Sequence, residues 1–232
     1  MMSAAVPETD VRQMFDRIAR HYDRANRVMS AGVDRWWRRK AIRLLLDGLG
    51  DAPCVLDLGA GTLDGGIEIL RRRPSARVFG ADFARNMLVQ GKTKPGASGI
   101  AVQLADGHAL PYQHSVFDAA WSSFCVRNLR DLRRAMTELR RVVRPGGRLV
   151  VLEFFRPRKE RAFFDGFYNA RVLPLLGRMV TGDAAAYRYL PDSIARFLSR
   201  AEFEGLLREV GFSQVRGRDL FPAGVASLVV AE

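Results

Sequence analysis

The chain has 232 residues, enough for one domain with a full hydrophobic core. Hydrophobic residues make up 48% and charged residues 27%, which excludes a disordered, collagen-like or low-complexity chain. Lysine and arginine number 37 against 25 acidic residues, so the net charge is +12 and the surface is expected to attract phosphate groups of nucleic acid or of anionic lipid. No apolar run reaches the roughly 18 residues of a transmembrane helix, and the first residues lack the basic and apolar stretches of a secretory signal.

Two cysteines, Cys54 and Cys125, lie in apolar runs that resemble strands. Neither has a second cysteine or a histidine at the spacing of metal ligands. We therefore expect no metal site and two buried, reduced thiols in a cytoplasmic protein.

The first fifty residues predict two helices. A helix over 8–29 is indicated by four apolar residues that recur at steps of four, three and four, on one helical face: Val11, Phe15, Ile18 and Tyr22. Gly32 ends this segment, and a second helix is expected over 34–49.

Strands and helices alternate from residue 53 onward. Strands are expected over 54–58, 77–82, 100–104, 116–123 and 148–154, with helices over 62–73, 84–92 and 131–143 and a tight turn at 145–147. This alternation predicts a parallel sheet covered by helices on both faces. Residues 156–198 interrupt it as a helical, aromatic and basic insertion, after which a helix over 202–210 and strands over 212–217 and 224–230 follow.

A glycine-rich turn follows the first predicted strand. Gly59 and Gly61 let the backbone bend tightly and let a flat ligand approach at the end of that strand. The fingerprint of a dinucleotide site is incomplete, because Asp64 stands where its third glycine belongs. Asp57, two residues before the first glycine, would repel a pyrophosphate and favour a cation.

A second carboxylate completes this pattern. Asp82 ends the second strand, 21 residues after Gly61, and is suited to accept hydrogen bonds from a ribose diol. An adenosine that carries a cationic amino acid fits both carboxylates, and that ligand is S-adenosylmethionine (SAM). An NAD site and a purely structural turn are the alternatives.

Further candidates lie at the ends of the next strands. Asp106 and Gly107 follow the third strand, where the aspartate can accept from an adenine amino group or be an ordinary loop residue. Phe83 and Met87 either flank the ribose and adenine or belong to the core.

Polar residues also follow the fourth strand, at the substrate side of the predicted cleft. Arg127 and Asn128 stand there, with a salt-bridged surface arginine as the alternative for Arg127. His108 and His114 are expected to be solvated loop residues.

Several motifs together resemble the ubiquinone/menaquinone biosynthesis C-methyltransferases over about residues 11–225. The motifs are Phe15-x-x-Ile18-Ala19-x-x-Tyr22-Asp23-x-x-Asn26, Val126-Arg127-Asn128-Leu129, Leu152-Glu153-Phe154 and Tyr187-Arg188-Tyr189-Leu190-Pro191-Asp192-Ser193-Ile194. The resemblance implies a class I SAM-dependent methyltransferase fold, an α/β Rossmann-like sheet in the order 3-2-1-4-5-7-6 with an antiparallel seventh strand. It also implies methylation of a ring carbon on a prenylated benzoquinol or naphthoquinol.

The resemblance carries over to individual positions. It implies that five residues contact SAM, three of which are already candidates above: Thr62, Asp82, Asp106, Gly107 and Ser123. It places Tyr22, Arg127 and Asn128 at the substrate. There Arg127 would stabilise a phenolate and Asn128 would orient a quinol oxygen. The proton would be accepted by Tyr22, Asp23 or a water molecule, and His21 is a minor candidate for this role. The chain departs from the family at Cys125, where glycine is common, and at Leu63, also usually glycine.

The expected organisation is a single methyltransferase domain over 1–232. It comprises N-terminal helices (8–49), a SAM-binding core (53–154), a helical lid (155–198) and a C-terminal part (199–232) that completes the sheet. A prenylated substrate resides in a membrane, so we expect the protein to dock peripherally on anionic lipid through the first helix and the insertion. We expect no nucleic-acid partner. A homodimer is possible. The alternatives are another lipid or phenolic acceptor, a nucleic-acid-binding protein with this fold, and a non-catalytic SAM binder.

Overall fold

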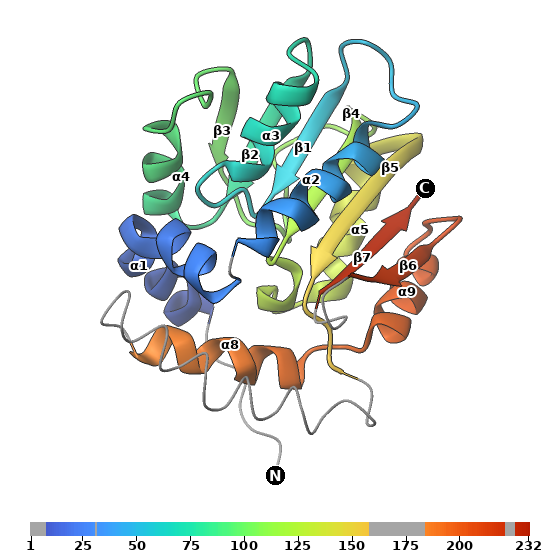
Figure 1. The fold of residues 1–232 in the computed structure, drawn as a ribbon. Helices are drawn as coiled ribbons and strands as arrows, with labels where there is room; N and C mark the ends of the chain where they lie inside the picture. Colours follow the sequence, from blue (N-terminus) through green and yellow to red (C-terminus); the bar gives the residue numbers. More distant parts are fainter. Residues whose placement is uncertain (1–7, 31, 158–183, 221–225) are drawn as a thin grey trace.

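The computed structural model describes residues 8–30, 32–157, 184–220 and 226–232. A seven-stranded sheet runs through it in the order β3-β2-β1-β4-β5-β7-β6 (Figure 1). The strands are β1 (Cys54–Leu58), β2 (Arg77–Asp82), β3 (Ile100–Leu104), β4 (Phe117–Ser123), β5 (Val143–Glu153), β6 (Arg216–Asp219) and β7 (Ser227–Ala231). Strands β1 to β5 are parallel, and β7 is antiparallel to both of its neighbours, which confirms the expected order.

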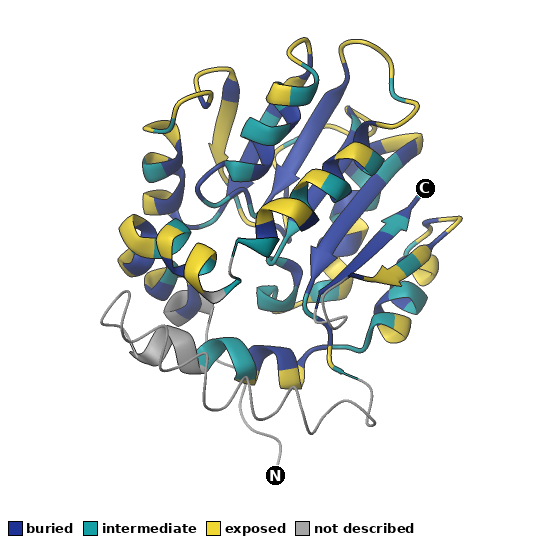
Figure 2. Cartoon of the chain, viewed as in Figure 1, coloured by how far each residue is buried: buried dark blue, intermediate teal, exposed yellow. Residues whose placement is uncertain are grey.

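Each central strand sends alternate side chains into two separate cores, because successive residues of a strand point to opposite faces. Leu56 and Leu58 pack with α5 (Leu132–Val142) and α9 (Arg200–Glu209). Val55 and Trp121 pack on the other face with α2 (Val33–Leu46), α3 (Asp64–Arg72) and α4 (Arg85–Lys92). Figure 2 shows the buried strands between helices whose outward faces are exposed.

Two helices lie beyond the edge where the parallel strands end. They are α1 (Glu8–Met29) and α8 (Ala184–Arg196) (Figure 1). A short 3-10 turn, η1 (Val126–Asn128), follows β4. Met14, Ile18 and Ala25 of α1 form a small core against which Tyr189 of α8 packs. None of the helices that the structure describes is both long and apolar enough to cross a bilayer.

Several element boundaries differ from the predicted ones. Strand β5 already begins at Val143 and includes the expected turn, because the register with β4 jumps between Val143 and Arg148 and Gly146 adopts a φ of 74°. Helix α3 starts only at Asp64, since Leu63 has a left-handed φ of 64°. The last two strands begin three to four residues later than predicted.

Two further expectations need correction or lie outside the description. Cys54 begins β1 as predicted, but Cys125 follows β4 instead of lying inside a strand. Of the expected lid, the part from 158 to 183 lies outside the described residues, and α8 is its described helix.

Candidate functional site

A pocket of about 630 Å³, part of it open to solvent, lies where β1, β2 and β4 end. The location matches the ligand position of open α/β sheets. Most of the predicted site residues line it: Tyr22, Gly59, Gly61, Asp82, Phe83, Met87, Asp106, Gly107, Ser123 and Asn128. Asp57, Thr62 and Arg127 are not among the lining residues.

The glycine turn and Asp82 form one side of the pocket. Gly59 and Gly61 have φ angles of 69° and 51°, which favour glycine. Asp82 Oδ2 accepts from the Gly61 N–H at 2.7 Å and Oδ1 from the Ala84 N–H at 2.8 Å. Burial raises the pKa of Asp82 to about 6. A carboxylate offers about four lone-pair sites, so Asp82 can still accept from a diol.

Asp106 is held in place by His108, which is only 5% exposed and not the solvated loop residue that we expected. The His108 backbone N–H and ring Nδ1 both contact Asp106 Oδ1, at 2.8 and 2.5 Å. His108 Nε2 accepts from the Asp131 N–H at 3.1 Å, so we assign the ring proton to Nδ1. Burial raises the pKa of Asp106, but the hydrogen bonds from His108 outweigh this effect and lower it overall.

Asp57 belongs to the opposite face of the sheet from Leu58. A Cβ on Gly65, at the start of α3, would lie 2.3 Å from Trp121 Nε1 and 2.7 Å from Asp57 Oδ2, so only glycine fits above the pair. Within the described part of the chain, neither of these atoms has a hydrogen-bond partner. Burial raises the pKa of Asp57 to about 7. Its contact with a cofactor therefore remains a prediction.

Arg127 is a buried member of an ion pair and not a surface arginine. Its Nη1 lies 2.5 Å from Glu153 Oε1, and its side chain is 7% exposed. Its Nε contacts Ser193 Oγ at 3.3 Å. Burial opposes the charge on Arg127, but the Glu153 carboxylate outweighs it and raises the pKa above its ordinary value. The guanidinium therefore stays protonated beside the pocket.

Asn128 and Tyr22 form the neighbouring part of the wall. The Tyr189 hydroxyl donates to Asn128 Oδ1 at 3.0 Å, which ties α8 to η1. Tyr22 packs edge-on against Phe15, with ring centroids 6.1 Å apart. Burial raises the pKa of Tyr22, although a hydrogen bond with Asn26 and the Arg127 charge oppose the shift. Tyr22 is therefore a phenol at neutral pH, suited to donate a hydrogen bond and not to accept a proton.

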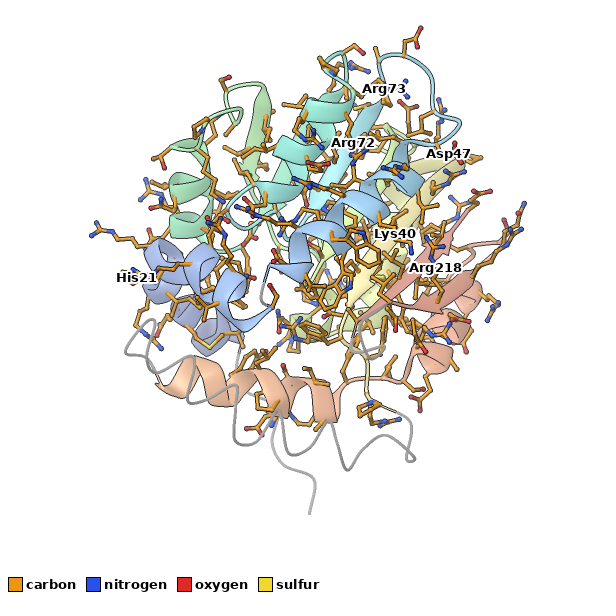
Figure 3. All side chains as sticks on the ribbon, in the orientation of Figure 1. His21, Lys40, Asp47, Arg72, Arg73 and Arg218 are labelled. Carbon is orange, nitrogen blue, oxygen red and sulfur yellow. The ribbon has the colours of Figure 1, made fainter. Side chains whose placement is uncertain are left out.

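Two other candidates for the proton acceptor lie away from the pocket. His21 is exposed on the outer side of α1 and points away from the protein (Figure 3). Asp23 accepts from Thr62 Oγ1 at 2.5 Å and is not among the residues that line the pocket.

Glu153, Tyr189 and Ser193 complete the site, and reasoning from the sequence assigned them no role. All three fall inside motifs that carry the family resemblance, which was the available signal. Phe124, Cys125 and Leu129 also line the pocket.

The lining fits SAM better than a dinucleotide. Among its described residues are two carboxylates, Asp82 and Asp106, and no lysine or arginine. A pyrophosphate would meet negative charge there, whereas a cationic amino acid joined to adenosine would be attracted.

Comparison with known proteins decides the family. A model of the ubiE/COQ5 methyltransferase family matches residues 3–231. The chain belongs to this methyltransferase family. It is 41% identical over 225 residues to a ubiquinone/menaquinone biosynthesis C-methyltransferase, UbiE, of Syntrophotalea carbinolica, covering 96% of this chain and 93% of that one. It is 43% identical over 223 residues to a demethylmenaquinone methyltransferase of Thermus thermophilus, covering 94% and 99%.

Solved structures support the fold of this family member. A SAM-dependent methyltransferase of Thermotoga maritima, a possible histamine N-methyltransferase, superposes with a TM-score of 0.66 at 18% identity, covering 94% of this chain and 97% of that one. The cyclase SpnF superposes with a TM-score of 0.72 at 18% identity, covering 98% and 97%. At such identities the likeness shows the class I SAM methyltransferase fold alone.

Proposed function

We propose that this protein methylates a ring carbon of a lipid-soluble prenylated quinol, with SAM as the methyl donor. The names of the two relatives given above refer to methylation in menaquinone or ubiquinone biosynthesis. The observation that carries the proposal is the meeting of two distant family motifs. Tyr189 of α8 contacts Asn128, which lines the pocket, and Ser193 of α8 contacts the neighbouring Arg127.

The cofactor side is proposed to use the residues around the glycine turn. Asp82 would accept from the ribose hydroxyls and Asp106 from the adenine amino group, while Phe83 and Met87 pack against the rings. Gly59, Gly61, Gly107 and Ser123 leave room for the ligand, and Asp57 and Thr62 support the turn from behind. When bound, SAM supplies an electrophilic methyl group on a sulfonium.

The substrate side is proposed to create the nucleophile. A quinol ring carbon becomes nucleophilic when the adjacent hydroxyl loses its proton, because the phenolate pushes electron density into the ring. Arg127, fixed by Glu153, stabilises that negative charge, and Asn128 and the Tyr22 phenol hydrogen-bond the quinol oxygens. No carboxylate lines this side among the described residues, so we assign the proton to a water molecule.

Membrane contact is proposed to occur through α1, with residues 155–198 as the lid. Apart from His21, the exposed acidic and basic side chains that the structure describes on α1 are arginines: Arg12, Arg17, Arg20, Arg24 and Arg27. Its two described aspartates, Asp16 and Asp23, accept hydrogen bonds from neighbouring elements. Each such arginine contributes about 1 kcal/mol at an anionic lipid surface. This docking would bring the pocket to a substrate dissolved in the bilayer.

Incubation with methyl-labelled SAM and a chemically reduced lipid extract, followed by mass spectrometry, tests the proposal. A labelled benzoquinone or naphthoquinone is expected and identifies the ring. Label in a phospholipid or a water-soluble phenol would reject the quinol, and no label despite SAM binding would favour a nucleic-acid-binding or non-catalytic role.

A vesicle test addresses the membrane contact. Sedimentation with anionic vesicles is expected for the wild type and should fall for Arg20→Glu/Arg24→Glu. The matched control is Arg216→Glu/Arg218→Glu, which makes the same change in net charge at two exposed arginines of β6. Arg218 lies distant from α1 (Figure 3). Equal losses in both variants would reject α1 as the docking surface.

A further inference from the structure

Helix α1 covers the cofactor pocket. Phe15 and Tyr22 of this helix line the pocket together with Gly61 and Phe83. The rings of Phe15 and Phe83 meet edge-on with centroids 6.5 Å apart. A nucleoside in this pocket would therefore lie between α1 and the sheet, and its escape depends on how firmly α1 is held.

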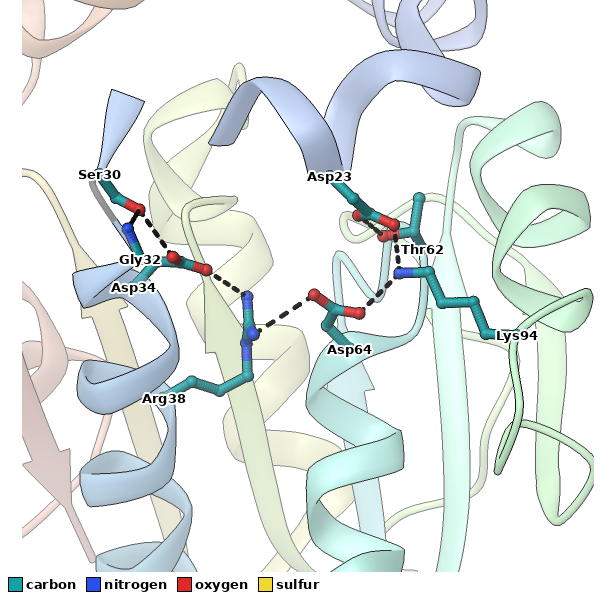
Figure 4. Close-up of polar contacts among 8 residues, drawn as sticks. All are labelled: Asp23, Ser30, Gly32, Asp34, Arg38, Thr62, Asp64 and Lys94. Atoms are coloured by element: carbon teal, nitrogen blue, oxygen red, sulfur yellow. Dashed lines mark hydrogen bonds and ion pairs between the residues drawn. The ribbon is translucent and has the colours of Figure 1, made fainter. Parts of the chain in front are cut away.

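Polar side chains hold α1 to the glycine turn (Figure 4). Asp23 of α1 accepts from Thr62 Oγ1 at 2.5 Å with one oxygen. Its other oxygen lies 2.5 Å from Lys94 Nζ, and the same ammonium lies 2.6 Å from Asp64 Oδ1 at the start of α3. We call Asp23, Thr62, Asp64 and Lys94 the α1 latch.

The fold delivers Lys94 to this place through a close helix contact. A Cβ on Gly91, in the last turn of α4, would lie 2.6 Å from Leu63 Cγ and 2.8 Å from the Thr62 carbonyl carbon. Glycine thus lets α4 rest directly on the turn. Lys94 follows two residues after α4 and is only 19% exposed.

The latch continues to the start of α2. Arg38 lies 3.3 Å from Asp64 and 3.4 Å from Asp34, and Asp34 accepts from Ser30 Oγ at 2.6 Å. Both sides of the α1–α2 connection are therefore tied to the residues that follow β1.

We propose that Lys94 is a positioning residue that keeps α1 closed over the cofactor pocket and sets how long the nucleoside stays bound. This inference rests on the proposed function for the identity of the nucleoside. The argument is electrostatic: without the ammonium, Asp23 loses its cationic partner and Asp64 keeps only Arg38, so the two carboxylates repel each other more strongly and α1 is held less firmly on the turn. Charged hydrogen bonds of this partly buried kind contribute more than neutral ones.

Lys94→Met tests the proposal because it keeps the apolar stem and removes the charge. We expect hydrogen exchange of the α1 amides to rise about tenfold in the protein without ligand, with α9 unchanged. The dissociation rate of SAM, followed by stopped-flow fluorescence, should rise by a similar factor. Lys94→Arg should stay near wild type. Asp23→Asn/Lys94→Met should recover part of the loss, since the repulsion is gone and the amide oxygen of the new side chain still accepts from Thr62.

Arg200→Met is the matched control. Arg200 also bridges two carboxylates, Glu204 at 3.1 Å and Asp219 at 3.2 Å, and is 23% exposed, but it lies at α9 and β6. It should leave α1 exchange and SAM dissociation unchanged. Unaltered α1 exchange in Lys94→Met, or equal increases in both variants, would overturn the latch. Faster α1 exchange in a protein that does not bind SAM would sustain the latch and reject the proposed cofactor.

Discussion

Glu153 Oε1 lies 2.5 Å from Arg127 Nη1, and the Glu153 side chain has no exposed surface. The same carboxylate accepts from the Phe154 N–H at 2.7 Å and from the Arg127 N–H at 3.3 Å. Glu153, at the end of β5, therefore fixes both the side chain and the backbone of Arg127 beside the pocket.

Glu153→Gln should destabilise the protein strongly, since it leaves a buried guanidinium without its counter-charge. Breaking such a pair costs about 3–5 kcal/mol, measurable by urea denaturation. Glu209→Gln is the control, because the Arg133–Glu209 pair is exposed on both sides and should give no measurable change. Equal stability of the two variants would contradict a structural role for the buried pair.

Arg127→Ala should lower turnover far more than SAM affinity. Loss of a fixed positive charge near a developing phenolate costs roughly 100-fold or more in kcat. SAM affinity should change little, because Arg127 is not among the residues that line the pocket. The measurements are single-turnover methyl transfer and SAM titration on the same preparation. Parallel losses in both quantities would refute the assigned role.

Gly59→Ala should prevent normal folding of the glycine turn. The added Cβ would lie 2.3 Å from Cys125 Sγ, at a φ of 69°. Gly59→Ala/Cys125→Gly removes the clash and should recover most stability, leaving the about 1–2 kcal/mol of a left-handed alanine. Thermal melting and SAM titration of both variants measure this. A double variant no better than Gly59→Ala would show that the contact with Cys125 is not the cause.

Asp57 should make the stability of the ligand-free protein depend on pH. Burial raises its pKa from 3.8 to about 7, so the folded protein holds this proton more tightly than the unfolded chain. Protonated Asp57 therefore contributes its full amount to the free energy of unfolding below about pH 4, and this contribution is lost as the pH rises through about 7. The stability advantage of Asp57→Asn over the wild type should therefore grow between pH 5 and pH 8, by at most about 3 kcal/mol.

Urea denaturation at pH 5, 6.5 and 8 checks this expectation, with Asp51→Asn as a control at a fully exposed position. A difference between Asp57→Asn and wild type that stays constant across this range would contradict a buried, titrating carboxylate.

The sequence by itself determined the features that depend on neighbours along the chain. Alternating apolar runs and helices predicted the strands, and Gly59 and Gly61 marked the turn after β1. Asp82 could be predicted as a ligand-site residue because it ends the strand that follows this turn, and it lines the pocket. The family motifs predicted the strand order, which the sheet confirms.

Only the tertiary structure decided what each polar side chain faces. Asp57 and Leu58 are adjacent in sequence, yet strand alternation turns Asp57 toward Trp121 in the other core. Arg127 meets Glu153 and Ser193, which are 26 and 66 residues away. His108 became a buried support of Asp106 because the backbone of Asp131 donates to its ring. Such contacts depend on strand register and helix docking, which bring distant segments together. Neither can be inferred from the local pattern of residues.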